Sequence, residues 1–457
     1  MQRLRKLKAN GFERLNVKER TTFSDGTMVT VDWDTKTVRD YARDQGGEVM
    51  RIPWIFTAII CAAGAVTVSG QMAHAQTGRF ESDLAFLQQH TKVVVLADPS
   101  GSAKVVVAPE YQGRVMTSTT GGADAPSFGW IGRSAVSSGK RQPHMNVFGG
   151  EDRFWLGPEG GQFALYFKKG DPFDLDHWQV PEALDWGAWD IAKQSPTSVQ
   201  VHKRMALTNY SGAAFDIDVE RTVRLLGASD AVNALGVTPG AGVRMVAFES
   251  SNAARNAGRQ PWDLKTGAVS IWILGQLTPS ADTTIVLPIS AGSTATLGIA
   301  VKDDYFGKVP ADRLEVKDAV VFFRGDGRYR SKIGVPPRRA LPVAGSYDAA
   351  NHVLTVVTFT RPANARQYVN SMWEIQGEPY SGDVINSYND GPPAPGKPPL
   401  GPFYELETSS PALALGPRET YTHVHRTFHF TGPEAALDAI ARATLKVSLE
   451  QIKTAFR

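Results

Sequence analysis

The sequence predicts an all-β fold, a large antiparallel β-sandwich that carries a helix at its C-terminal end. Short apolar runs recur along most of the chain, and clusters of Gly, Pro, Asn and Asp separate them, as expected for strands joined by turns. Residues 215–223 alternate apolar and polar side chains, the pattern of a half-buried strand. Helical patterns are few, and we find no fixed-period repeat of the kind that would indicate a propeller.

The elements follow in order from the same patterns. A short amphipathic helix is predicted at 80–90, and a β-meander follows it at 92–96, 104–108 and 113–118, with a turn at 98–101. Further strands are predicted at 162–167, 198–206, 215–226, 269–274, 296–301, 319–323, 352–359 and 420–430. One helix is predicted at 433–456, with Thr431 as its cap and Pro433 in its first turn. We expect its apolar stripe to pack on the sandwich.

The front of the chain resembles a secretory signal peptide. Residues 52–75 contain no charged side chain, follow Arg51, and end in the small-x-small pattern Ala73-His74-Ala75. The apolar core at 54–68 is short for a membrane span. We therefore predict a signal peptide at 50–75 with translation starting at Met50, so that 1–49 is an over-extended start or a disordered basic tail. The alternative is an N-terminal anchor behind a basic cytoplasmic tail.

These boundaries predict a sandwich domain at 76–432 and a C-terminal helix at 433–457. The protein is then exported, periplasmic or extracellular, with no stable membrane span after cleavage. Residues 1–75 contain 11 of the 49 Lys/Arg and 8 of the 46 Asp/Glu, so 38 of each remain and the mature chain is formally neutral. The pI of 8.8 therefore does not indicate nucleic-acid binding. The only cysteine, Cys61, leaves with the signal, so the fold depends on its core.

The most distinctive stretch of the sandwich is 146–167, where two Gly pairs bracket charged and aromatic residues. Glu151, Asp152, Arg153 and Trp155 combine hydrogen-bonding groups with a flat apolar ring, which suits the binding of a sugar. The alternative is a tight turn with an internal ion pair and core aromatics.

Two loops add candidates for the same purpose. In the loop 171–181, His177 is a candidate proton donor and Trp178 could stack on a pyranose, although a buried loop tryptophan beside acidic turn residues is the alternative. In a second loop, Asn386, Tyr388, Asn389 and Asp390 offer groups for sugar hydroxyls, although a plain Asx turn fits equally. The segment 391–402 that follows is proline-dense and predicted to be extended.

Acid–base candidates lie late in the chain. Glu405 and Glu407 share one face of a predicted strand, and two close carboxylates raise at least one pKa. We assign Glu407 as a base and Glu405 as its neighbour or a ligand; the alternative is two solvated glutamates. His423, His425 and His429 share a face of the next strand. His425 is a candidate acid, and His423 and His425 are candidate metal ligands; a structural role is the third option.

Several segments resemble the galactose-mutarotase-like superfamily, with the closest resemblance to uncharacterised secreted members. They are Tyr111-Gln112-Gly113-Arg114-Val115-Met116, the Gly-Gly, Arg, Trp, Pro stretch, Leu207-Thr208-Asn209-Tyr210-Ser211, and Phe403-Tyr404-Glu405-Leu406-Glu407-Thr408 with Pro411 after it. The resemblance implies a β-supersandwich with a carbohydrate site, and Glu407 in the position of the catalytic glutamate. The chain departs from the pattern where Tyr210, not histidine, follows Asn209.

Together these observations predict an exported carbohydrate-active protein, leaning towards an enzyme that uses Glu/His acid–base chemistry as an epimerase, lyase or glycosidase. A non-catalytic glycan-binding protein and a structural envelope protein are the alternatives. The expected partner is a carbohydrate and not nucleic acid. No cofactor is required, a divalent metal is left open, and the oligomeric state is not defined. There is no Walker-type loop, Gly-x-Ser-x-Gly elbow or paired-cysteine metal motif.

Overall fold

The computed structural model describes residues 80–121 and 126–456, and the backbone of five strands within 9–51. The chain divides into two compact units, Met1–His74 and Ala75–Arg457. The first holds an antiparallel sheet of strands β1 (Ala9–Leu15), β2 (Lys18–Phe23), β3 (Met28–Asp32), β4 (Thr37–Tyr41) and β5 (Glu48–Arg51). Beyond Arg51 the predicted signal peptide lies outside the described residues, so the signal peptide and the start at Met50 stay predictions.

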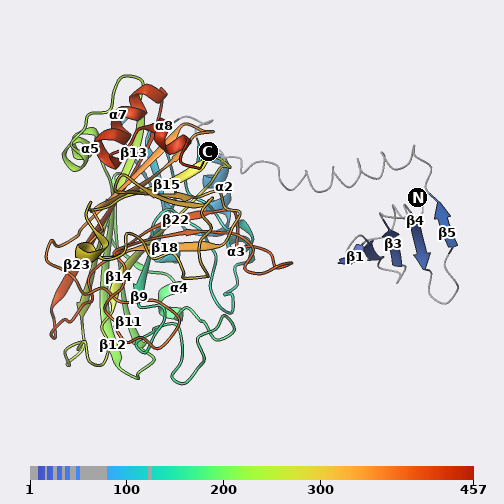
Figure 1. Cartoon of the computed structure of the whole chain (residues 1–457). Helices are drawn as coiled ribbons and strands as arrows, with labels where there is room; N and C mark the ends of the chain where they lie inside the picture. The colour runs from blue at the N-terminus through green and yellow to red at the C-terminus, as the bar shows by residue number, and fades with distance from the viewer. Residues whose placement is uncertain are drawn as a thin grey trace. The chain divides into compact units, whose positions relative to one another are not determined.

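The second unit confirms the predicted antiparallel β-sandwich (Figure 1). Its largest sheet has ten strands, in the order β10 (Asp190–Ser195), β11 (Ser198–Thr208), β12 (Ala214–Leu225), β13 (Arg244–Asn256), β23 (Thr420–Thr431), β20 (Val353–Phe359), β19 (Val343–Asp348), β15 (Thr283–Pro288), β17 (Val320–Arg324) and β16 (Leu314–Lys317). A second sheet has the order β18 (Ser331–Val335), β21 (Ile385–Asn389), β22 (Tyr404–Ser409), β14 (Ser270–Leu277) and β9 (Arg153–Gly157). The predicted meander forms a third sheet of β6 (Val94–Ala97), β7 (Lys104–Ala108) and β8 (Arg114–Thr119).

Helices are short and lie around the sheets. They are α2 (Phe80–His90), the 3₁₀ turn η2 (Pro109–Tyr111), α3 (Arg133–Ser138), α4 (Glu182–Asp185), α5 (Ala228–Leu235), α6 (Thr294–Leu297), α7 (Glu434–Leu445) and α8 (Leu449–Lys453). Figure 1 shows α5, α7 and α8 together at one end of the long strands. Among the described residues, no helix has both the length and the apolar character needed to cross a membrane.

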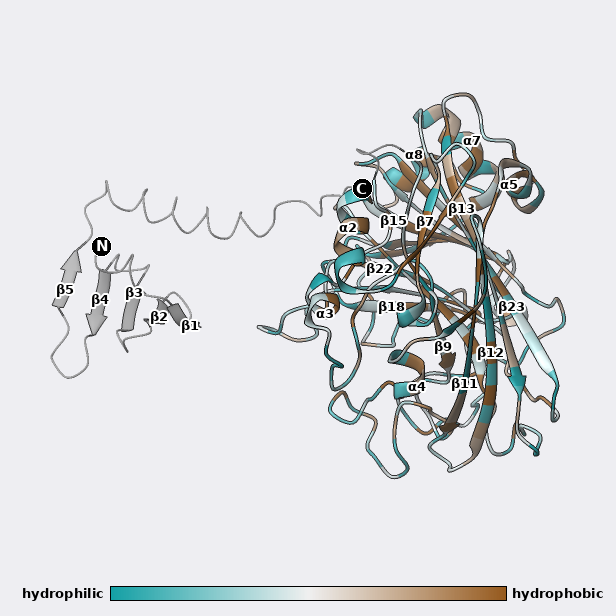
Figure 2. Cartoon of the chain, turned by 180° about the vertical axis from the view of Figure 1, so that it is seen from behind, coloured by the Kyte–Doolittle hydropathy of each residue, from teal (hydrophilic) through white to brown (hydrophobic). Residues whose placement is uncertain are grey.

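The two larger sheets bury their facing sides against each other. Strand β12 illustrates this packing, since its buried and more exposed residues alternate along its length as predicted. Figure 2 shows apolar and polar residues alternating on the long strands. Residues of β11, β12 and β13 pack with β9 and β14 in one apolar cluster. Residues of β15, β17, β19 and β20 pack with β18, β21 and β22 in another. The five-stranded sheet therefore has one face in the core and one face turned away from it.

Strand β23 separates two environments. Phe428 and Phe430 belong to the cluster that α7 and α8 cover, whereas His425 and His429 point to the opposite face, between the sheets. The predicted C-terminal helix is confirmed, but it is divided into two helices. It breaks at Lys446, which adopts a left-handed conformation, and Ser448 caps a new helix by accepting a hydrogen bond from the Gln451 N–H. The residue before the first helix is Pro433, not Thr431.

Two predicted strands are also corrected. Residues 162–167 form turns, in which the Leu165 N–H donates to the Pro158 carbonyl, and the strand of this region is β9 before them. The apolar content of 162–167 reflects burial against β9 and not pairing in a sheet. The predicted strand at 296–301 instead begins with the helical turn α6, capped by the Ser293 hydroxyl. Short apolar runs do not distinguish buried turns from strands.

Candidate functional site: a pocket on the five-stranded sheet

The outward face of the five-stranded sheet carries rows of polar side chains that the strand register aligns. Lys332 on β18 pairs with Tyr388 on β21, Tyr388 with Glu405 on β22, and Glu405 with Gln276 on β14. The next row contains Asn386, Glu407, Leu274 and Arg153. Alternation along each strand puts these residues on the face that points away from the core.

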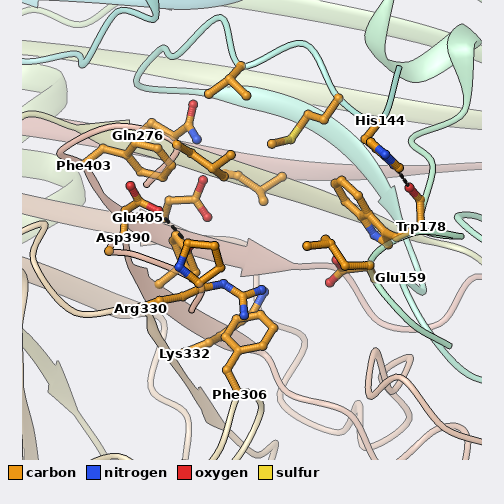
Figure 3. Close-up of a pocket in the computed structure, with 18 of the residues that line it drawn as sticks. His144, Glu159, Trp178, Gln276, Phe306, Arg330, Lys332, Asp390, Phe403 and Glu405 are labelled. Atoms are coloured by element: carbon orange, nitrogen blue, oxygen red, sulfur yellow. Dashed lines mark hydrogen bonds between the residues drawn. The ribbon is translucent and has the colours of Figure 1, made fainter. Parts of the chain in front are cut away.

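Over this face lies a cavity of about 340 Å³, a volume within the range of about 300–1,000 Å³ found for small-molecule sites. Its walls are rich in aromatic residues: Trp155, Trp178, Trp272, Phe306, Trp373, Tyr388 and Phe403. Ionisable side chains also line it: His144, Arg153, Glu159, Asp176, Arg330, Lys332, Asp390 and Glu405. Figure 3 shows Glu405 with Asp390 and Gln276 at one side of the drawn lining, and Glu159 with Trp178 and His144 at the other.

Glu405 is the carboxyl of the sheet that lines the cavity. It is 6% exposed, and burial raises its pKa to about 8, a shift that the charge of Arg153 opposes and that of Glu407 supports. Arg153 Nη2 lies 3.4 Å from Glu405 Oε1, and the Arg153 guanidinium carbon lies 3.8 Å from the centre of the Trp155 ring. Near neutral pH Glu405 can therefore hold a proton, the state required of a general acid.

Glu407 lies beneath the cavity and does not line it. Its side chain has no exposed surface. Its Oε2 accepts hydrogen bonds from Trp272 Nε1 at 2.9 Å and from Lys332 Nζ at 3.1 Å. The sequence placed Glu405 and Glu407 on one face, and the structure agrees, but the depth of the two side chains differs. The assignment of Glu407 as a base stays a prediction, now with a salt bridge that gives it a structural role.

Two further carboxyls of the lining have raised pKa values. Burial raises the pKa of Glu159, and the charge of Lys332 opposes this while that of Glu407 adds to it. Burial also raises the pKa of Asp390 to about 6, against hydrogen bonds from the Gly401 N–H and the Tyr388 hydroxyl that favour the ionised form. Glu159 follows β9 and Asp390 follows β21, so the loops after two strands add carboxyls to the one on β22.

The predicted histidines lie on the other side of β22. Thr408 Oγ1 is 2.9 Å from both His423 Nε2 and His425 Nδ1, and Thr408 faces the ten-stranded sheet while Glu405 and Glu407 face away from it. Glu407, the candidate base, and His425, the candidate acid, therefore lie on opposite sides of β22. Burial lowers the pKa of His423 to about 3 and that of His425 to about 4, so both are neutral.

The position of His423 and His425 between the sheets also bears on whether they can bind a metal ion. Within the described part of the chain, no group of three or more His, Cys, Asp or Glu side chains is arranged to hold a metal ion. His423 and His425 share a threonine hydroxyl between the sheets, and the candidate carboxylates Glu405 and Glu407 are on the far side of β22. The candidate metal ligands His423 and His425 therefore do not share a site with Glu405 or Glu407.

The predicted binding residues separate into two groups. Arg153, Trp155, Trp178, Tyr388 and Asp390 line the cavity.

Glu151, Asp152, Asn386 and Asn389 do not line it. Glu151 Oε2 is 2.9 Å from His429 Nε2, and Asp152 pairs with Arg221, with all four side chains almost fully buried. Asn386 Nδ2 donates to the Ile333 carbonyl at 3.2 Å. Asn389 accepts from the Gly327 N–H at 2.8 Å and so holds a turn.

His177 lies outside the cavity. It is exposed, and its Nδ1 is 2.6 Å from Asp174 Oδ1. That hydrogen bond raises the pKa of His177. The residue lines a broad neighbouring groove, whereas the histidine that lines the aromatic cavity is His144, whose Nδ1 is 2.8 Å from the Trp178 carbonyl oxygen.

Sequence reasoning missed much of the lining. Missed residues are His144, Glu159, Trp272, Gln276, Phe306, Arg330, Lys332 and Trp373. Lys332 had a local signal, because it is the one charged residue of a short strand in which Ile333 and Val335 occupy the alternate positions after it. Its proximity to Glu407 depends on the pairing of β18, β21 and β22, which no local pattern contains.

Several solved structures are similar to this chain. The Slr1438 protein from Synechocystis sp. PCC 6803 has a TM-score of 0.46 and 12% identity, covering 75% of this chain and 96% of its own. A putative aldose 1-epimerase from Escherichia coli K12 has a TM-score of 0.45 and 11% identity, covering 75% and 99%. A galactose mutarotase-like protein from Lactobacillus casei ATCC 334 has a TM-score of 0.43 and 9% identity, covering 74% and 100%. The names of the last two neighbours belong to the galactose-mutarotase-like group that the sequence resembles.

No curated protein sequence matches the chain. A family model does match, and it spans residues 78–456, which is nearly the whole of the second compact unit. The chain belongs to this family, described as a family of unknown function (DUF6786).

Proposed function

We propose that the chain is an exported carbohydrate-active enzyme that performs acid–base chemistry on a sugar bound in the aromatic cavity, with Glu405 as the proton donor. Export rests on the signal-like segment 50–75. The enzymatic part rests on the polar atoms of the cavity and on the state of Glu405.

The observation that carries the proposal is a set of unpaired polar atoms that belong to residues lining the cavity. Trp155 Nε1, Trp178 Nε1, Arg153 Nε and Gln276 Oε1 have no hydrogen-bond partner among the described residues, and all four residues line the cavity. Buried polar groups in native proteins are nearly always paired. A ligand that suits this set offers several donors and acceptors over a compact apolar body. A sugar ring does this, with its C–H faces against tryptophan and its hydroxyls towards the unpaired atoms.

The chemistry follows from the carboxyls on the two sides of the cavity. Glu405 is protonated near neutral pH because of its raised pKa and can donate to a sugar oxygen. Glu159, across the drawn lining in Figure 3, supplies a second carboxyl for the complementary proton transfer. We use Glu405 as the donor in place of the candidate acid His425, because His425 lies on the core side of β22. Epimerisation, elimination and glycoside hydrolysis all use such a pair.

The test uses the full chain with a panel of mono- and oligosaccharides, thermal unfolding for binding and proton NMR for turnover. We expect at least one sugar to raise the melting temperature and to be converted. Glu405→Gln should keep the stabilisation and lower the rate by about 10²–10⁴-fold, the usual contribution of a general acid. The matched control is Glu220→Gln, at an exposed position of β12 outside the cavity, and it should retain the rate.

The outcomes separate the alternatives. A sugar that stabilises the chain but is never converted would make the protein a glycan-binding protein. A converted sugar with an unchanged rate in Glu405→Gln would remove Glu405 from the mechanism. If no sugar changes the melting temperature, the carbohydrate proposal fails.

A further inference from the structure

Three Arg and Lys side chains line the cavity, and they differ in the groups that contact them. Arg153 pairs with Glu405 at 3.4 Å and Lys332 pairs with Glu407 at 3.1 Å. Arg330, directly before β18, lines the same cavity. Its guanidinium forms neither an ion pair nor a hydrogen bond with any residue that the structure describes. It is half-buried, so its charge is less screened than that of a surface arginine.

Arg330 is held in place by an aromatic ring. Its guanidinium carbon lies 3.7 Å from the centre of the Phe306 ring, and Phe306 also lines the cavity. Figure 3 shows Arg330 and Phe306 together at one edge of the lining, near Lys332. Stacking on a ring fixes the plane of a guanidinium and leaves its N–H edge free for a ligand.

In the described part of the chain, no neighbouring carboxyl forms an ion pair with Arg330. The two oxygens of Asp390 accept hydrogen bonds from other groups, the Tyr388 hydroxyl at 2.9 Å and the Gly401 N–H at 2.8 Å. The positive charge of Arg330 lowers the pKa values of Asp390 and Glu159, yet burial outweighs it and both remain raised. Glu405, the partner of Arg153, also has a raised pKa. Among the described residues, the guanidinium of Arg330 therefore has no carboxylate within ion-pairing distance, although it lines the cavity.

We propose that the sugar bound in this cavity is acidic, and that its carboxylate, sulfate or phosphate group pairs with Arg330. The inference rests on the proposed function, since it names the substrate class of the same site. A planar guanidinium binds such groups through two parallel hydrogen bonds, which a neutral sugar cannot match. The unpaired tryptophan and glutamine atoms would then bind the hydroxyls of the same ring.

The test compares matched probes by calorimetry with the full chain. D-glucuronate and D-galacturonate are measured against D-glucose and D-galactose, with glucose 6-sulfate and glucose 6-phosphate as the other two anions. We expect one acidic class to bind about tenfold or more tightly than its neutral counterpart, the size of a hydrogen-bonded charge contact. Raising the NaCl concentration should weaken the binding of the acidic probe and leave the binding of a neutral probe unchanged. Which class binds identifies the anionic group.

Two variants localise the effect. Arg330→Gln should remove the preference for the acidic probe, whereas Arg328→Gln, an exposed arginine two residues away and outside the cavity, should retain it. Neutral sugars that bind as tightly as acidic ones, with no salt dependence, would overturn this inference and leave the carbohydrate proposal intact. An acidic preference that survives in Arg330→Gln would also overturn it. No binding of any probe would reject the proposed function itself.

Discussion

Replacing Lys332 with methionine should cause a large loss of stability that a second substitution restores. Lys332 and Glu407 form an ion pair at 3.1 Å, with side chains 7% and 0% exposed. Burial lowers the pKa of Lys332, but the charges of Glu407, Glu159 and Glu405 raise it more, so the ammonium stays charged. Methionine keeps the apolar stem but leaves the Glu407 carboxylate without its countercharge. The Oε1 atom of Glu407 already has no hydrogen-bond partner among the described residues.

The magnitude follows from the burial of the pair. Removing one member of a buried ion pair costs about 3–5 kcal/mol, because the remaining charge is neither hydrated nor paired. Trp272 Nε1 still donates to Glu407 at 2.9 Å, which favours the lower end of that range. In the double variant Lys332→Met with Glu407→Gln no buried charge remains, and we expect a loss of only about 1–2 kcal/mol relative to the native chain.

The assay is urea unfolding of both single variants and the double variant. Lys317→Met, at an exposed position on β16, is the control and should change the free energy of unfolding by less than about 0.5 kcal/mol. A loss below about 1 kcal/mol in Lys332→Met, or a double variant as unstable as the sum of the singles, would refute the reasoning. Turnover adds a second readout. If Glu407 is the base assigned from the sequence, the single variant Glu407→Gln loses turnover under conditions in which it is folded, and if Glu407 is only structural, turnover remains.

Two more predictions concern the two faces of β22. Thr408→Val preserves the shape of the side chain but leaves nitrogens of His423 and His425 unpaired, so the free energy of unfolding in urea should fall by about 1–3 kcal/mol. Sugar affinity should not change, because Thr408 faces the core. An unchanged urea midpoint would contradict the described contacts. The folded pKa of Glu405, about 8, lies above its ordinary value of 4.5. Its contribution to stability is therefore present below about pH 4.5 and is lost as the pH rises towards 8. The urea midpoint of the native chain should fall more steeply from pH 5 to 8.5 than that of Glu405→Gln, and parallel curves would reject the raised pKa.

The period-two pattern predicted which residues share a face, but not what each face meets. His423, His425 and His429 do share a face of β23, as the sequence indicated. That face points between the sheets, because Phe428 and Phe430 on the other face are covered by the C-terminal helices. A strand with large side chains on both faces has no solvent side from which to assign its orientation, so sequence alone could not decide it.

The stretch 146–167 shows the same limit at the level of single residues. Arg153 and Trp155 reach the cavity, while Asp152 pairs with Arg221 in the core. Alternation along β9 produces this division once the face of Arg153 is known. The face itself is set by pairing with β14, more than a hundred residues further along the chain, where Arg153 opposes Leu274. Local composition identified the right segment, and long-range register decided which of its charges could meet a ligand.

The origin of the lining residues bears on how the family could vary its substrate. Arg153, Gln276, Lys332, Tyr388 and Glu405 stand on five hydrogen-bonded strands, so the sheet register fixes their mutual positions. Glu159, Trp178, Asp390 and the proline-rich segment 391–402 instead enter the cavity from loops. Rigid elements position reacting groups more accurately than loops, and loops change more readily in sequence and length. In the proposed function, Glu405 therefore belongs to the part of the site that the sheet holds fixed, and the loops around it set the shape of the sugar that we propose binds there.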